Sequence, residues 1–538
     1  MARTESRSRR NLALLLAGAV HALSFAPGPL PELALPFVEL FSLAVLAYAV
    51  FCAGTVRRAA GAAFLFGLGN FALGLYWIFI SLHVYGGLAW PLAVAAVAIL
   101  AAFEALYITL AAALARWLNA GRMPAPASLG RYLLVAAVWA SAWTGAEWLR
   151  GTLFTGFPWM NIGYAHVDGV LAPWAPVLGV YGVAWLAAFA AGSVAMFAAA
   201  KDTRDDKTAA AVLGIAILTG LAGILLGHVD WAHPHGKTII MRLVQGNVPQ
   251  SEKFQPRLLW QGLATYTRLA ALPPKAPDGA PNVVVMPETV LPVFQDQVAP
   301  DVWQQFIDIA RNLNASLILG VPLHVRQGQS NRYTNSAIVV TPDSSARRIA
   351  AGDIAMHYDK HHLVPFGEYV PTGFRWFIDA LRIPLGDFNR GAARQPVFDL
   401  AGQRIAPDIC YEDVFGEEII RSVRDSGTHG AGASILVNIS NLGWFGNSWA
   451  LRQDLQIARM RALETARPMM RATNTGMTAA ISPKGVVRAQ LPAMSKGVLD
   501  VEVQGMSGLT PYVRWGNLPV LIWTAFLLLL GLGLRRRR

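Results

Sequence analysis

The chain has 538 residues, of which 54% are hydrophobic and only 14% are charged. Soluble proteins carry about a quarter charged residues, so this composition excludes a disordered chain and disfavours a purely soluble enzyme. A net charge of +12 raises the question of a nucleic-acid partner, and the two cysteines, Cys52 and Cys410, exclude a disulfide framework and a cysteine-based zinc cluster.

Eight apolar runs are long enough to cross a membrane, because a span needs about 20 mostly apolar residues. We therefore predict a multi-pass α-helical membrane domain with seven transmembrane helices in residues 1–228 and an eighth in 516–538, followed by a basic tail. Glu104 falls within the fourth run, where a charged group is either functional or a neutral carboxyl that fixes helix packing. The runs are 11–27, 36–53, 60–82, 88–115, 132–149, 174–200, 208–227 and 517–534.

Lysine and arginine concentrate on alternate connections between these runs. One side holds sixteen basic residues, whereas the short loops on the other side hold only Arg150. Cytoplasmic loops carry the excess of Lys and Arg, so both termini are predicted to be cytoplasmic and residues 229–515 to lie outside the cytoplasm. The sixteen residues are Arg3, Arg7, Arg9, Arg10, Arg57, Arg58, Arg116, Arg122, Arg131, Lys201, Arg204, Lys207, Arg535, Arg536, Arg537 and Arg538.

The same distribution argues against nucleic acid as a partner. Residues 229–515 carry 28 Lys and Arg against 24 Asp and Glu, without a basic run. The excess positive charge lies mostly in the connections that orient the membrane helices, so we interpret it as a topology signal.

Short β-rich runs alternate with amphipathic stretches in 229–515, which predicts an α/β domain with a substantial core. The predicted strands are 238–245, 282–286, 316–321, 335–340, 404–409, 433–439 and 478–482, and the predicted helices include 256–271, 299–313 and 447–467.

Chemically active side chains follow two of these strands and fill a loop between them. Glu288 follows 282–286, Cys410 follows 404–409, and the loop from Tyr358 to Tyr369 holds Lys360 and Glu368. Because α/β sheets place their chemistry beyond the carboxyl ends of strands, we expect one shared site. Cys410 alone would more often be a small buried hydrophobe, but an unpaired cysteine outside the cytoplasm weakens that interpretation.

These residue types suit catalysis through a nucleophilic thiol. Glu288 could take the thiol proton of Cys410 and return it to a leaving group. Lys360 could stabilise the oxyanion of a tetrahedral intermediate, while Glu368 could orient the lysine or share the role of base.

Other candidates carry weaker signals. His357, His361 and His362 could suggest a metal, but adjacent side chains on an extended chain point apart, which favours solvated or packing roles. The strand exit from Asn438 to Phe445, which includes Trp444, is either substrate-facing or a simple Asx turn. The loop after the fifth run, which includes Trp159, suits a membrane interface or a surface through which lipid reaches the site. A Ser-His-Asp hydrolase lacks its G-x-S-x-G elbow near a strand end.

The Glu288, Lys360–Tyr369 and Cys410–Glu412 segments resemble the Glu–Lys–Cys pattern of the carbon–nitrogen hydrolase (nitrilase) superfamily. With seven preceding spans and one following span, the whole chain resembles its membrane-embedded family, the apolipoprotein N-acyltransferases. Further matching stretches are Leu243–Gln250, Tyr333–Ser336, Arg461–Glu464, Arg471–Gly476 and Gly156–Trp159.

The resemblance implies an αββα sandwich that faces the periplasm from a Gram-negative inner membrane. It assigns Glu288 as base, Lys360 as oxyanion partner and Cys410 as nucleophile. The supporting residues would be Glu368, Tyr411 and Glu412, and the substrate-binding residues Phe254, Trp444, Trp159 and Tyr369. Leu442 and Asp454 depart from the family pattern, which has an acidic residue and a histidine there.

The resemblance also implies a two-step reaction. Cys410 takes an acyl chain from a phospholipid, typically phosphatidylethanolamine, as a thioester, and the α-amino group of a diacylglyceryl-cysteine on an apolipoprotein then accepts it. We expect no cofactor, no metal, no nucleic acid and a monomeric enzyme. Two alternatives remain: a membrane-tethered amidase or nitrilase in which water resolves the thioester, and a transporter with a periplasmic sensing domain.

Overall fold

The computed structural model describes residues 2–25, 30–119, 128–200, 206–255, 257–274, 279–327, 330–371, 373, 375, 387–424 and 432–536. The chain forms two compact units. The first contains residues 1–79, 90–230 and 515–538, and the second contains residues 80–89 and 231–514.

The first unit is built from long helices, with one at each of the eight apolar runs. Long apolar stretches favour helices here, because a helix satisfies all of its backbone hydrogen bonds internally. Their bounds are α1 Ala2–Ala22, α2 Leu35–Phe51, α3 Val56–Gly74, α4 Trp90–Leu118, α5 Leu129–Arg150, α6 Ala175–Ala200, α7 Asp206–Leu226 and α16 Leu518–Arg536.

Within the described residues, five helical segments are long and apolar enough to cross a membrane. They are Glu32–Phe51, Trp90–Leu118, Ala172–Ala200, Lys207–Leu226 and Leu518–Arg536. Helices α1, α3 and α5 are not among them; polar residues such as Asn70 in α3 and Glu147 in α5 lower their hydropathy. The chain is therefore a membrane protein, but the predicted count of eight spans is not confirmed. The basic residues Arg122, Lys201, Arg204, Arg537 and Arg538 lie outside the described residues.

Two buried residues of the first unit, Glu104 and Arg150, form an ion pair. Glu104 Oε2 lies 3.8 Å from Arg150 Nη1. The same Nη1 donates hydrogen bonds to the backbone oxygens of Phe157 and Trp159, each at 2.6 Å. Arg150 thus lies within ion-pair distance of Glu104 and also holds the aromatic loop after α5 to the end of that helix.

The second unit contains two six-stranded sheets. One has the order β12-β1-β2-β3-β4-β5 and the other β11-β10-β9-β8-β7-β6. In the first sheet β1, β2 and β3 run parallel, and in the second sheet β7, β8 and β9 run parallel. The remaining neighbouring strands are antiparallel. The strands are β1 His233–Gln245, β2 Val283–Val285, β3 Ser316–Gln327, β4 Ser330–Val340, β5 His357–Asp359, β6 Phe398–Leu400, β7 Gln403–Ile409, β8 Ile435–Ser440, β9 Met469–Thr473, β10 Ala479–Ile481, β11 Val487–Gln490 and β12 Gly497–Ser507.

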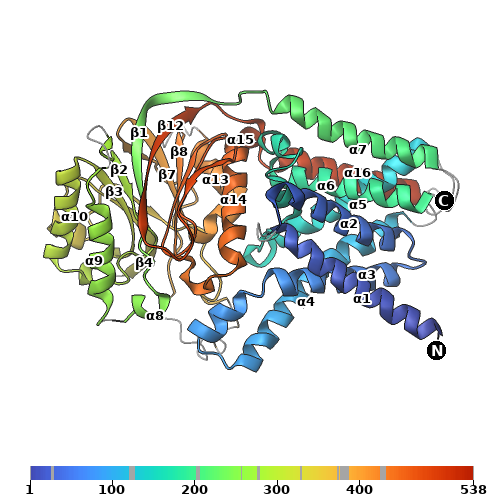
Figure 1. Cartoon of the computed structure of the whole chain (residues 1–538), viewed down its shortest axis with the longest axis horizontal. Helices are drawn as coiled ribbons and strands as arrows, with labels where there is room; N and C mark the ends of the chain where they lie inside the picture. The colour runs from blue at the N-terminus through green and yellow to red at the C-terminus, as the bar shows by residue number, and fades with distance from the viewer. Residues whose placement is uncertain are drawn as a thin grey trace. The chain divides into compact units, whose positions relative to one another are not determined.

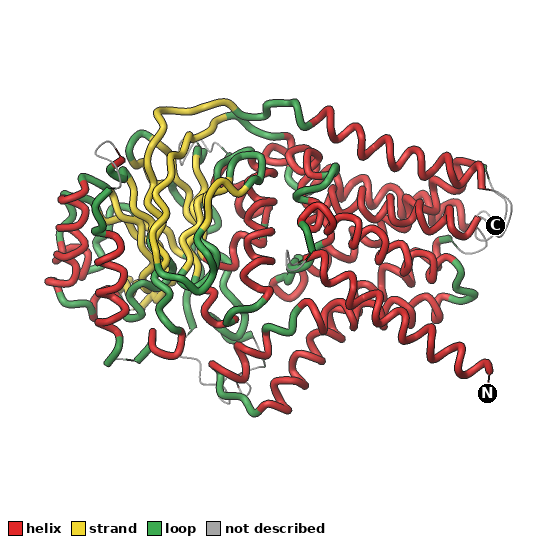
Figure 2. Tube along the Cα trace, in the orientation of Figure 1, coloured by secondary structure: helices red, strands yellow, loops and turns green. Residues whose placement is uncertain are grey.

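The two sheets stack face to face, and helices cover their outer faces (Figures 1 and 2). A core cluster joins side chains of both sheets, including Leu243, Val285, Ile409 and Val437. Further clusters join the first sheet to α9 and α10, and the second sheet to α13 and α14. The order of layers is the expected αββα sandwich. The helices of this unit are α8 Gln250–Lys253, α9 Leu259–Ala270, α10 Pro300–Leu313, α11 Ala346–Ala350, α13 Gly416–Val423, α14 Trp449–Thr465 and α15 Pro511–Trp515.

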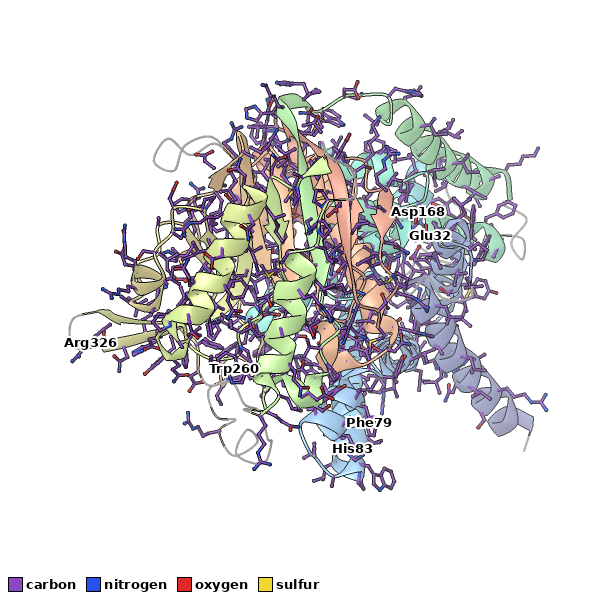
Figure 3. The ribbon with its side chains drawn as sticks, turned by 60° about the vertical axis from the view of Figure 1, so that its left-hand side comes forward. Glu32, Phe79, His83, Asp168, Trp260 and Arg326 are labelled. Carbon is purple, nitrogen blue, oxygen red and sulfur yellow. The ribbon has the colours of Figure 1, made fainter. Side chains whose placement is uncertain are left out.

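The segment 80–89 belongs to the sandwich unit although it connects α3 with α4. It opens with a π-helical turn, Ile80–Tyr85, which contains His83 (Figure 3). A ring nitrogen of His83 lies 2.7 Å from the backbone oxygen of Leu88. The sequence predicted only a continuous apolar run ending at 82, so the attachment of this segment to the sandwich was missed.

Candidate active site

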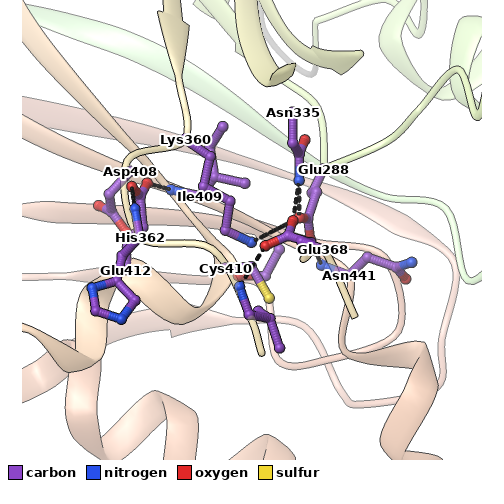
Figure 4. A network of polar contacts seen from close by, with 12 residues as sticks. Glu288, Asn335, Lys360, His362, Glu368, Asp408, Ile409, Cys410, Glu412 and Asn441 are labelled. Atoms are coloured by element: carbon purple, nitrogen blue, oxygen red, sulfur yellow. Dashed lines mark hydrogen bonds and ion pairs between the residues drawn. The ribbon is translucent and has the colours of Figure 1, made fainter. Parts of the chain in front are cut away.

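Glu288, Lys360 and Cys410 come together beyond the carboxyl ends of three strands of the sandwich. Glu288 follows β2, Lys360 follows β5 and Cys410 follows β7, so both sheets contribute. Lys360 Nζ lies 3.4 Å from Glu288 Oε1, and the Cys410 sulfur lies beside this pair (Figure 4). The expectation that side chains at separate strand ends share one site is thus met in the geometry.

Lys360 is held between two carboxylates and is 1% exposed. Its Nζ lies 2.9 Å from Glu368 Oε1, closer than to Glu288. Burial alone would lower the pKa of Lys360, but the carboxylates of Glu368 and Glu288 outweigh it and raise the pKa above the ordinary lysine value. Lys360 is therefore a permanent cation beside the thiol.

Three donors hold the Glu288 carboxylate in place. Besides Lys360, the side chain of Asn335 donates to Oε1 at 2.8 Å and the backbone N–H of Asn441 donates to Oε2 at 3.0 Å. Gly320 in β3 permits the close approach of this segment, since a Cβ there would lie 2.6 Å from the Cα of Glu288. Charge-assisted hydrogen bonds of this kind fix the orientation of a catalytic carboxylate.

Cys410 occupies a strained backbone position at the end of β7. Its φ of 56° is left-handed, a conformation that costs a non-glycine residue about 1–3 kcal/mol. Neighbouring contacts hold it there: Asn438 Nδ2 donates to the backbone oxygen of Cys410 at 3.2 Å, and the backbone N–H of Ile409 donates to Glu412 Oε2 at 2.7 Å.

Burial raises the pKa of the Cys410 thiol well above its ordinary value. The Glu288 carboxylate raises this pKa further, whereas the Lys360 ammonium lowers it. The resting cysteine is therefore a protonated thiol, and it needs a base to become a nucleophile.

Glu412 organises the backbone on both sides of the site. Its Oε1 accepts from the hydroxyl of Tyr358 at 2.9 Å and from the backbone N–H groups of His361 and His362 at 2.6 and 3.0 Å. Because these residues flank Lys360, Glu412 links the lysine segment to the cysteine turn. The ring of Tyr411 meets that of Phe415 edge to face, with the centroids 5.2 Å apart.

Three of the four residues expected to bind substrate lie in the sandwich unit. The rings of Phe254 and Trp444 are 5.8 Å apart, and Trp444 also meets Tyr85 of segment 80–89, edge to face at 6.0 Å. Tyr369 lies under the guanidinium of Arg390 at 5.4 Å. The fourth, Trp159, belongs to the helical unit, where it is 3% exposed and meets Trp77 at 5.2 Å.

The histidines near Lys360 have protein partners. The ring of His362 stacks on Phe415 with centroids 3.6 Å apart, and a ring nitrogen of His361 lies 2.8 Å from the backbone oxygen of Gly391. Among the described residues, no group of three or more histidine, cysteine or acidic side chains is arranged to hold a metal ion.

The two departures from the family pattern lie in the core beside the site. Asp454 on α14 forms a buried ion pair with Arg471 on β9, whose Nη1 also lies 3.3 Å from Asp413 Oδ2. Leu442 is 1% exposed and faces Gly476, where a Cβ would come within 2.9 Å of its Cδ1. Asp454 thus pairs with Arg471 inside the core, and Leu442 packs against Gly476.

Two polar residues of the site, Asn335 and Lys253, were not predicted as functional, and a third, Asn441, lies in the strand exit that was predicted as either substrate-facing or an Asx turn. Asn335 donates to both carboxylates, at 2.8 Å to Glu288 and 2.7 Å to Glu368. Asn441 contributes only its backbone N–H to Glu288, and the Nζ of Lys253 donates to the backbone oxygen of Glu288 at 3.1 Å. Asn335 and Lys253 lie in or beside stretches noted only for their resemblance to the family, and no chemical motif marks either residue.

Comparisons of the sequence with known relatives agree on one family. The profile described as apolipoprotein N-acyltransferase N-terminal domain matches residues 17–193, and that of carbon–nitrogen hydrolase matches residues 241–512. The chain is similar to the apolipoprotein N-acyltransferases of Bordetella bronchiseptica (53% identical over 533 residues, 98% of this chain and 97% of the relative) and Ralstonia nicotianae (44% over 526 residues, 98% and 93%). A solved carbon–nitrogen hydrolase superfamily protein of Xanthomonas campestris matches 50% of this chain and 91% of its own, at 18% identity and a TM-score of 0.37.

Proposed function

The chain belongs to the apolipoprotein N-acyltransferase family, and we propose that it moves an acyl chain from a phospholipid, in two steps, to the α-amino group of a diacylglyceryl-cysteine on an apolipoprotein. One observation carries the mechanism: a buried glutamate, a lysine locked in its charged form and an unpaired cysteine share one site. The acyl donor is expected to be phosphatidylethanolamine.

In the first step, Glu288 takes the proton from Cys410 Sγ, and the thiolate attacks the ester carbonyl of the phospholipid. Lys360 supplies its charge to the oxyanion that forms on the carbonyl oxygen. When the intermediate collapses, the C–O bond breaks and Glu288 returns the proton to the departing alkoxide. The products are a lysophospholipid and an acyl thioester on Cys410.

In the second step, the α-amino group of the acceptor attacks the thioester carbonyl. A C–N bond forms, the C–S bond breaks, and Cys410 regains a proton. A thioester is reactive enough toward an amine that the transfer needs no nucleotide.

The remaining predicted residues act through position. Glu368 and Asn335 hold Lys360 and Glu288, and Glu412 with Tyr411 shapes the turn that presents Cys410. Phe254, Trp444 and Tyr369 are proposed to bind the lipid chains, and Trp159 to serve the same path from the helical unit. Aromatic side chains suit this task because they bury large apolar surfaces and sit well at the membrane interface.

We further propose that the enzyme sits in the inner membrane with both termini in the cytoplasm and residues 229–515 in the periplasm. Sixteen basic residues on one set of connections against one on the other support this orientation.

The direct test is to incubate the purified protein with phosphatidylethanolamine and a synthetic diacylglyceryl-cysteine lipopeptide. We expect an N-acylated lipopeptide and lysophospholipid in equal amounts, and no product with Cys410→Ser. Release of free fatty acid without N-acylation of the peptide would instead indicate a hydrolase.

A further inference from the structure

A second buried lysine, Lys253, lies beside the site and has a different environment from Lys360. It ends the short helix α8, is 4% exposed, and donates from Nζ to the backbone oxygen of Glu288 at 3.1 Å. Among the described residues, no carboxylate lies within ion-pair distance of this Nζ, whereas Lys360 contacts two. Apart from the backbone oxygen of Glu288, no acceptor in the described part of the chain lies within hydrogen-bond distance of this Nζ.

Helix α8 presents another unsatisfied polar group to the same place. The Oε1 of Gln250 accepts from the side chain of Asn441 at 3.0 Å, and Asn441 in turn holds the Glu288 carboxylate. The Nε2 of Gln250, on a side chain 5% exposed, has no hydrogen-bond partner among the described residues. Buried polar groups are normally satisfied, so two incompletely satisfied side chains on one turn indicate a position that a substrate occupies.

The surroundings of Lys253 stabilise its protonated form only weakly. Burial lowers the pKa of Lys253 to about 7; the Glu288 carboxylate, and the Cys410 sulfur when it is ionised, only partly oppose this effect. On its own helix, the other charged side chain is Glu252. Near neutral pH, Lys253 therefore exists substantially as an uncharged amine, which can accept a proton.

The proposed second step releases one proton more than the thiol takes up when the acceptor arrives as an ammonium. An acceptor that arrives as an ammonium has three N–H protons, and the amide product keeps one. One of the two released protons returns to Cys410 through Glu288, which as a single carboxylate holds one proton at a time. Lys360 cannot take the other, because two carboxylates keep it protonated.

We propose that Lys253 accepts this extra proton from the α-ammonium group of the acceptor and so supplies the free amine that attacks the thioester. The lone pair of Lys253 Nζ takes one proton, the freed amine attacks the thioester carbonyl, and the C–S bond breaks as Sγ regains a proton through Glu288. Lys253 then loses its proton to water. This inference rests on the proposed function, but it concerns the second step alone.

Single-turnover kinetics separates the two steps. The protein is first acylated with phosphatidylethanolamine alone, and a diacylglyceryl-cysteine lipopeptide is then added at pH 7 and at pH 9. For Lys253→Met, we expect transfer at pH 7 to slow by about tenfold more than acylation does, because only about one in ten α-amino groups with a pKa of about 8 is unprotonated at that pH. At pH 9 the defect should largely disappear, because an α-amino group with a pKa of about 8 then arrives unprotonated.

Two further variants distinguish proton transfer from the loss of a cation or of packing at Lys253. Lys253→Arg keeps a cation that can donate to the Glu288 carbonyl but cannot accept a proton, so it should share the transfer defect. Lys496→Met, at an exposed lysine of the same unit, is the matched control and should behave as wild type. Rescue by arginine, loss of acylation together with transfer in Lys253→Met, or an equal defect at both pH values would overturn the role of Lys253. Failure of the wild-type protein to become acylated would instead overturn the proposed function.

Discussion

The backbone N–H of Asn441 donates to Oε2 of Glu288 at 3.0 Å, and this contact joins the two sheets of the sandwich at the site. Glu288 follows β2 of one sheet, whereas Asn441 follows β8 of the other. Lys360 and Cys410 are divided between the sheets in the same way. The relative positions of these residues therefore depend on how the two sheets stack. A packing change in the shared core should shift the Cys410 thiol relative to Glu288 and Lys360.

Glu288→Gln and Lys360→Met should differ in their response to pH. Glu288→Gln removes the base but also removes a carboxylate that raises the pKa of Cys410, so acylation should be slow at pH 7 and recover partly as pH rises. Lys360→Met removes the cation that lowers this pKa, so its thiol ionises even less readily and acylation should stay low. We expect a loss of about 10²–10³-fold for the lysine variant, typical of one oxyanion donor.

The measurement is the rate of acyl-enzyme formation for both variants between pH 6 and pH 10, with intact-mass detection. Parallel pH profiles for the two variants would show that the separate assignments of base and oxyanion partner are wrong.

Asn335→Leu should reduce stability and activity together. The single amide of Asn335 donates to both Glu288 and Glu368, so its loss leaves two buried carboxylates with fewer donors. We expect the free energy of unfolding to fall by about 1–3 kcal/mol, the usual cost of an unsatisfied buried group, and the rate of acylation to fall as the carboxylates shift. Asn331→Leu, at an exposed position of the same strand, is the control for thermal unfolding. A variant of wild-type stability and rate would exclude the positioning role.

Much of the chemistry could be predicted from the sequence, because its residues stand at strand ends that hydrophobic patterning reveals. Glu288 and Cys410 follow recognisable buried strands, and each of the seven predicted strands overlaps an observed one. The short strand β5, the edge strand β12 and the contacts of Asn335, Asn441 and Lys253 could not be predicted. Hydrogen bonds between segments far apart in the chain leave no local pattern, and Asn441 acts through its backbone, which any residue would supply.

The number of membrane spans is a second feature that hydropathy alone could not predict. Apolar runs predict helices, and a helix was found at each run, but α5 contains Arg131, Glu147 and Arg150 and falls short of a span by composition. The run ending at 82 also crosses from one unit into the other at Ile80. Hydropathy averages over such boundaries, so it cannot find the point at which a helix leaves the membrane domain.

Asp408→Asn should alter how stability depends on pH. Burial raises the pKa of Asp408 to about 7, whereas an unfolded aspartate has a pKa of about 3.9. The folded state therefore binds the proton more tightly, and wild-type stability falls as pH rises between these values. Asparagine cannot ionise, so the unfolding temperature of the variant relative to wild type should be higher at pH 8 than at pH 5.

Thermal unfolding in detergent at the two pH values measures this difference. Asp399→Asn, at an exposed position on β6, is the matched loss of a carboxylate. If the difference between Asp408→Asn and wild type is the same at both pH values, Asp408 does not titrate in this range.

The proposed orientation predicts opposite locations for two reporter insertions. A reporter placed after Arg58 should lie in the cytoplasm, and one placed in the turn at Ser344 should lie in the periplasm, because the sixteen basic residues mark the cytoplasmic connections. Paired enzymatic reporters that are active on only one side of the membrane distinguish the two locations. Activity of both insertions on the same side would contradict the orientation.

Intact-protein and peptide mass spectrometry after incubation with phosphatidylethanolamine alone tests the central claim most directly. The account predicts one acyl group on the peptide that contains Cys410, released by hydroxylamine as a thioester would be. Cys52→Ser should keep this adduct, and Cys410→Ser should lose it, because a serine hydroxyl stays protonated beside the same base. Absence of an acyl adduct from the wild-type protein, or full acylation of Cys410→Ser, would contradict a thioester mechanism at Cys410.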